Sequence, residues 1–128
     1  MATEGKNRAK EQAQAQLRSI IEMVKALETE DLHAREEAEQ AIHDGPLEVS
    51  VRSDWHDPGG RKDEESEYKI LLCTGGPAVR IIGDLDRFGQ PETASLEYQD
   101  WFTPWESFDV CDDEEQALLA YAGCFYYR

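Results

Sequence analysis

Apolar residues recur with two different periods along the chain, and the change of period divides it into two parts. Within residues 6–29 the apolar positions return every three or four residues, at Ala13, Leu17, Ile20, Val24 and Leu27. This spacing places them on one face of a helix. A weaker stripe of the same period runs through residues 30–43 and stops at the Asp-Gly-Pro sequence that begins at residue 44. The pattern therefore predicts two separate helices within residues 1–45.

The segment after Pro46 alternates apolar and polar residues, which is the period of a β-strand. In its first part the apolar positions are Leu47, Val49 and Val51, as in a half-buried strand. Short turns join three further apolar segments, at residues 68–73, 78–85 and 94–102. Strands that are joined by short turns pair with their neighbours in antiparallel fashion. The pattern therefore predicts a four-stranded antiparallel meander.

The C-terminal segment predicts a third helix. Four acidic residues at 112–115 supply negative charge where the start of a helix favours it, and an apolar stripe continues to Phe125. We therefore expect an α+β fold with two N-terminal helices, a four-stranded antiparallel meander and one C-terminal helix. Residues 1–128 would form a single domain, with a helical part at 1–45 and the sheet and last helix at 46–128.

The stripe of the first helix has to be covered, either by the sheet of the same chain or by a second copy. It spans two heptads, which is more apolar surface than a small four-stranded sheet needs. The length of the stripe therefore slightly favours a homodimer through this helix.

Charge narrows the class of partner. The 128 residues include 28 Asp and Glu against 13 Lys and Arg, which gives a formal net charge of −15. Residues 84–115 alone hold eleven carboxylates and one arginine. A negative field of this size repels nucleic acid and attracts basic surfaces. We therefore expect a protein partner with a basic surface and no direct binding to nucleic acid.

The same sequence indicates a cytoplasmic protein that does not contact membranes. It has no apolar run of roughly 18 residues, the length that a spanning helix needs, and its N-terminus has no apolar stretch of the secretory type. Its three cysteines, Cys73, Cys111 and Cys124, form no CxxC pair. We expect them to be free thiols in a reducing compartment.

No motif for catalysis, a metal or a cofactor is evident. Gly75 and Gly76 precede a strand pattern and not the start of a helix, so they predict a turn and not a phosphate site. Cys73 would need a base such as His56, across the first hairpin, to act as a nucleophile. Its position at the end of an apolar strand instead favours an inert, buried thiol. We therefore expect no catalytic residue, no metal, no cofactor and no enzymatic activity.

Aromatic residues form a second distinctive group, at Trp55, Trp101, Phe102 and Trp105. Pro104 interrupts regular strand pairing, so residues 102–105 are expected to form an irregular crossing segment. The favoured interpretation is that the rings complete the core of a small domain. The alternative is that one or two remain exposed beside carboxylates, as in a protein-binding surface.

The sequence EYKILLCTGGPAVRIIGDLDRFGQPETASLEYQDWFTPW, at residues 67–105, resembles small acidic proteins of unknown biochemical function encoded by bacteriophages and prophages. The resemblance brings no catalytic motif. It implies a short protein in the host cytoplasm that is encoded near functions for host takeover and evasion of defence. Many phage proteins of this size and charge, among them anti-CRISPR and anti-restriction proteins, occupy a nucleic-acid-binding surface of a host complex.

Charge and resemblance together favour a non-enzymatic inhibitor or interaction protein that binds a basic, nucleic-acid-binding surface of a host complex, in the manner of a DNA mimic. The candidate contacts are Asp84, Asp86, Glu97, Asp100, Trp101, Trp105, Glu106, Asp109, Asp112 and Asp113. Asp84 and Asp86 are two residues apart on one expected strand, so their side chains would lie on the same face. Two alternatives remain: a phage accessory or structural protein that assembles through its N-terminal helix, and a small-ligand-binding protein or enzyme built around residues 73–77.

Overall fold

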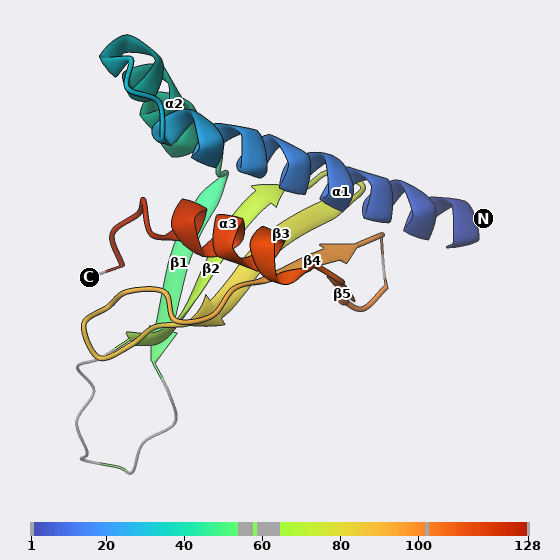
Figure 1. Ribbon diagram of the computed structural model, residues 1–128. Helices are drawn as coiled ribbons and strands as arrows, with labels where there is room; N and C mark the ends of the chain where they lie inside the picture. The colour runs from blue at the N-terminus through green and yellow to red at the C-terminus, as the bar shows by residue number, and fades with distance from the viewer. Residues whose placement is uncertain (1, 54–57, 59–64, 102, 128) are drawn as a thin grey trace.

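The computed structural model describes residues 2–53, 58, 65–101 and 103–127. In this part of the chain three helices and a five-stranded antiparallel sheet form an α+β fold (Figure 1). The helices are α1 (Ala2–Leu27), α2 (Leu32–Asp44) and α3 (Asp112–Ala122). The strands are β1 (Glu48–Ser53), β2 (Glu65–Cys73), β3 (Ala78–Asp84), β4 (Ser95–Gln99) and β5 (Glu106–Phe108).

The fold class, the three helices and the antiparallel meander are confirmed, since the strands lie in the order β1-β2-β3-β4-β5. The expected number of four strands is wrong, because β5 adds a fifth that pairs with β4. Pro104 lies two residues before β5, so its missing N–H is not needed in the ladder. This strand has only three residues and follows a proline, so the alternation pattern did not predict it.

The core lies between one face of the sheet and the two helices α1 and α3, which cross that face (Figure 1). Ile70, Ile81 and Leu96 stand side by side on β2, β3 and β4 and have no exposed surface. Leu17 and Ile20 of α1 pack into the same cluster and are at most 3% exposed. The sheet and α3 of the same chain therefore cover the α1 stripe, the surface that we expected a second copy to share.

A break at residues 28–31 separates the two N-terminal helices. Asp31 caps the second helix, because its carboxylate accepts hydrogen bonds from the backbone N–H groups of His33, at 3.0 Å, and Ala34, at 3.4 Å. Helix α2 packs against α1 and extends beyond the sheet, at the upper left of Figure 1. Its position leaves most of its side chains in solvent.

A cluster of buried tyrosines forms part of the core. Tyr68 and Tyr127 are buried with ring centroids 5.2 Å apart. The Tyr68 hydroxyl donates to the carbonyl of Thr93 at 2.6 Å. A Cβ at Gly83 would lie 2.0 Å from that same carbonyl oxygen, so only glycine permits this close approach of the two chain segments.

Strand β1 differs from the expected half-buried strand. Val49 and Val51 stand opposite Ile70 and Tyr68 on the helix side of the sheet, but they remain 38% and 37% exposed. Leu47, just before the strand, is 61% exposed. The helices pack over β3 and β4, and β1 lies outside that cover. Alternation of apolar residues predicted the strand correctly but overestimated its burial.

Candidate functional site

The ten predicted contact residues do not form one surface. Asp84 and Asp86 lie at the β3–β4 connection, whereas Glu97 and Trp105 lie on the sheet face opposite the helices. The other six follow β4 along the chain: Asp100, Trp101, Glu106, Asp109, Asp112 and Asp113. The exposed fraction and the contacts of each residue decide which of them can meet a partner.

Asp86 has a structural role in its own turn. One of its carboxylate oxygens accepts hydrogen bonds from the backbone N–H groups of Phe88, at 2.8 Å, and Gln90, at 3.0 Å. Strand β3 ends at Asp84, so Asp84 and Asp86 do not form the row along one strand that their parity predicted. Asp84 itself is exposed, and its backbone N–H binds the hydroxyl of Thr93 at 2.9 Å.

Glu97 is neutralised within the chain. Its carboxylate accepts from two nitrogens of Arg80, Nε at 2.8 Å and an NH2 group at 2.7 Å, and only 15% of its side chain is exposed. The Arg80 guanidinium lies 4.0 Å from the centre of the Trp105 ring, in cation–π geometry. Glu97, Arg80 and Trp105 therefore hold each other in place, and Glu97 offers little charge to a partner.

The expectation that the tryptophans complete the core is wrong for the two that the structure describes. Trp101 is 59% exposed, and Trp105 is half-buried beneath Arg80. Trp55 and Phe102 lie outside the described residues, as does His56. The β4–β5 connection is held by the Gln99 side chain, which donates to the Thr103 carbonyl at 2.8 Å. Asp100 and Glu106 beside it are half-buried.

Three of the predicted acidic residues are exposed together at the start of α3: Asp109, Asp112 and Asp113. Their neighbour Glu114 caps the helix, because its carboxylate accepts from the Cys111 N–H at 2.9 Å. None of the three forms an ion pair with a residue in the described part of the chain. With Asp84, these residues are the predicted contacts whose charge remains available.

Helix α2 and its flanks form a second acidic region, which the sequence-based hypothesis overlooked. Its exposed carboxylates are Glu28, Glu30, Asp31, Glu36, Glu37, Glu39, Asp44 and Glu48. Glu37 meets His33 at 2.9 Å, and Arg35 directs its guanidinium to the Thr29 carbonyl at 2.9 Å. The density of acidic residues in 28–48 is visible in the sequence, but the hypothesis took its contact residues only from the acidic and aromatic segment at 84–113.

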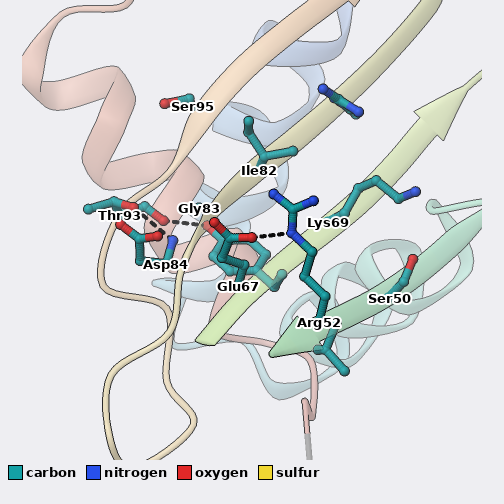
Figure 2. Close-up of a pocket in the computed structure, with 12 residues that line it drawn as sticks. Ser50, Arg52, Glu67, Lys69, Ile82, Gly83, Asp84, Thr93 and Ser95 are labelled. Carbon is teal, nitrogen blue, oxygen red and sulfur yellow. Dashed lines mark hydrogen bonds and ion pairs between the residues drawn. The ribbon is translucent and has the colours of Figure 1, made fainter. Parts of the chain in front are cut away.

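The face of the sheet opposite the helices is polar and lacks a helical cover in the described chain (Figures 1 and 2). A shallow cavity of about 440 Å³ lies on it, between β1, β2, β3 and the start of β4. Arg52 and Glu67 form an ion pair across its β1–β2 side, and Lys69 extends beside them (Figure 2). The alternation of side chains along each strand predicts which residues lie on this polar face, but only the pairing register between strands shows which charged residues are neighbours.

The corner at residues 73–77 supports a turn and not a reactive site. Gly75 and Gly76 have φ values of 98° and 150°, which residues with a side chain rarely adopt. Burial raises the pKa of the Cys73 thiol, and its sulfur lies 3.9 Å from the Pro77 carbonyl. A raised pKa leaves less thiolate at neutral pH, which disfavours nucleophilic chemistry.

No family model matches the chain, and comparisons with curated proteins and with solved structures find no match. Over the described residues, no group of three or more His, Cys, Asp and Glu side chains is arranged to hold a metal ion. None of the helices in that part of the chain has the length and apolar character needed to cross a membrane. The charges and exposed surfaces of the chain are therefore the properties that bear on its function.

Proposed function

We propose that this chain is a non-enzymatic interaction protein whose acidic surface binds a basic, nucleic-acid-binding surface of a host protein or complex. The observation that carries the proposal is the availability of charge at Asp84, Asp109, Asp112 and Asp113, which are exposed and form no ion pair with a described residue. The formal net charge of −15, whose acidic excess lies in residues 28–128, adds to this field. The resemblance of residues 67–105 to acidic phage proteins supports inhibition of the anti-CRISPR or anti-restriction kind.

Exposed carboxylates replace DNA phosphates at low cost in such a contact. They are held on a folded scaffold, so little backbone conformational entropy is lost when the partner arrives. A basic groove releases its bound anions when the carboxylates enter it, which favours binding at low salt. Trp101, which is 59% exposed, offers apolar area that a protein partner could contact.

The two alternatives from the sequence have less support. Assembly through the first helix would need an exposed stripe, and the chain's own sheet covers Leu17 and Ile20. A ligand site at residues 73–77 would need convergent polar groups, whereas a Cβ at Gly75 would meet no atom within 4 Å. The corner faces open space on that side.

Competition with DNA tests the proposal. The tagged protein is immobilised, host lysate is passed over it, and the captured proteins are challenged with a duplex oligonucleotide and, separately, with rising salt. We expect captured nucleic-acid-binding proteins that the duplex displaces, and affinity that falls at least tenfold between about 50 and 200 mM salt. Capture that neither duplex nor salt reverses would contradict charge mimicry.

A matched pair of variants locates the contact. In the first, Asp84, Asp109 and Asp113 become Lys; in the second, Glu30, Glu36 and Glu39 of the α2 region become Lys, with the same change of charge. All six side chains are exposed, so each change should cost under about 0.5 kcal/mol of folding stability, except Asp113→Lys, which also places a positive charge in the first turn of α3 and should cost up to about 1 kcal/mol more. We expect the first variant to lose the displaceable proteins and the second to keep most of them. Equal retention by both would overturn the assignment.

A further inference from the structure

We propose that β1 is a dimer interface through which two copies of this chain pair edge to edge, so that their sheets join into one antiparallel sheet across a twofold axis. The sheet has two edges, and they differ. Strand β5 has three residues and follows Pro104 closely, which limits pairing. Strand β1 has six residues and no proline, and no described strand lies on its outer side. Long edges of this kind are templates for a further strand.

Exposed apolar side chains gather at the same edge. Leu47, Val49 and Val51 make up three of the seven large apolar residues that are exposed in the described chain. Val49 and Val51 both lie on the helix side of the sheet, beside the buried Ile70 and Tyr68. A strand added at β1 would bring new side chains against these two valines and remove them from water.

The hydrogen-bond pattern of the sheet determines which backbone N–H and C=O groups of β1 point to its outer edge. The Leu85 N–H donates to the Ser66 carbonyl at 2.7 Å, which sets the alternation of the β2–β3 ladder. By this alternation Lys69 directs its backbone groups to β1, where it stands opposite Ser50. Val49 and Val51, one residue to either side of Ser50, therefore direct their N–H and C=O groups to the outer edge.

The sequence of β1 is complementary to itself in antiparallel orientation. When Ser50 stands opposite Ser50 of a second copy, Val49 faces Val51 of that copy, and the two valines can exchange backbone hydrogen bonds. In the same register Glu48 faces Arg52 of the second copy, and the twofold axis repeats both pairings. Both charged side chains are exposed. Opposite charges at both ends and valines between them favour a second copy over an unrelated strand.

A pair of charge variants tests this register. Glu48→Lys places Lys opposite Arg in both ends of its homodimer, and Arg52→Glu places Glu opposite Glu. A one-to-one mixture restores opposite charges at both ends of the mixed dimer. We expect sedimentation velocity to show wild type at twice the chain mass of 14.6 kDa at high micromolar concentration, each variant alone at least about tenfold weaker, and the mixture close to wild type. The control Glu36→Lys, with the same change of charge on α2, should dimerise like wild type.

A proline variant tests the backbone pairing independently of charge. Val51→Pro removes an N–H that points to the outer edge, so the ladder with β2 should keep its hydrogen bonds and the circular dichroism spectrum should be unchanged. We expect this variant to be monomeric. A wild-type chain that remains a monomer at several hundred micromolar overturns the proposal. So does a dimer that persists in both charge variants and shows no recovery on mixing, because it must use another surface.

Discussion

The two faces of the sheet are made from the same strands but are stabilised by different interactions. On the helix side, Ile70, Ile81 and Leu96 are wholly buried and contribute through removal of apolar surface from water. On the opposite side, the Arg80–Glu97 and Arg52–Glu67 pairs contribute through charge, and the second pair is largely in solvent. Burial of apolar surface therefore stabilises the fold mainly on the helix side, and we expect substitutions on the opposite face to cost less.

Adjacent isoleucines on β3 give the sharpest test of this difference and the largest expected effect. Ile81 points to the helices with no exposed surface, and Ile82 points to the polar face and is half-buried. Ile81→Ala should lower the free energy of unfolding by about 2–5 kcal/mol, because it leaves a cavity in the core. Ile82→Ala should cost about 1 kcal/mol or less. Urea unfolding of both variants measures this, and equal losses would show that the polar face is also part of the core.

Substitution of two arginines compares how much each ion pair on the polar face contributes to stability. Arg80→Ala would leave the mostly buried Glu97 carboxylate without its partner and remove the ring contact with Trp105, which should cost about 1–3 kcal/mol. Arg52→Ala should cost less than about 1 kcal/mol, since 79% of the Arg52 side chain is exposed. Thermal and urea unfolding would give both values. A larger loss for Arg52 would reverse the order of the two pairs.

Tyrosine ionisation tests the helix side through the pH dependence of stability. Burial raises the pKa of Tyr121 to about 12, and it also raises the pKa of Tyr68 and Tyr127 above the ordinary value of 10.0. The folded protein therefore holds these protons more tightly than the unfolded chain does. Stability should be constant below pH 10 as far as these groups are concerned, and it should fall as the pH rises from 10 through 12.

The measurement is urea unfolding at several pH values between 9 and 12. Tyr121→Phe should reduce the slope of stability against pH in this range, because one of the three buried hydroxyl groups is removed. Tyr126→Phe is the matched control, since Tyr126 is 93% exposed. If both variants keep the full slope, ionisation of the buried cluster does not cause the alkaline loss.

Local sequence patterns predicted most of the fold but less of the candidate site. The stripe through Leu17 and Ile20 predicted a buried helix face, and the alternation after Pro46 predicted the meander. Strand β5 was missed because three residues are too few to show a period. At the site, Asp109, Asp112 and Asp113 are exposed as the hypothesis requires. Glu97 pairs with Arg80 on the neighbouring strand, and no local pattern revealed that partner. Asp86 binds backbone N–H groups of its own turn, which is a common local role of aspartate that the hypothesis did not consider.

Local pattern and composition predicted the three helices, four of the five strands in their order, the side of each of these strands on which a residue lies, and the negative charge of the whole molecule. These properties depend on spacing within one segment or on composition, so they do not require a partner segment. Tertiary structure alone decided that β1 lies outside the cover of the helices and that Arg80 joins Glu97 to Trp105. Both depend on how segments far apart in the chain are aligned, because burial and ion pairing are properties of neighbours in space.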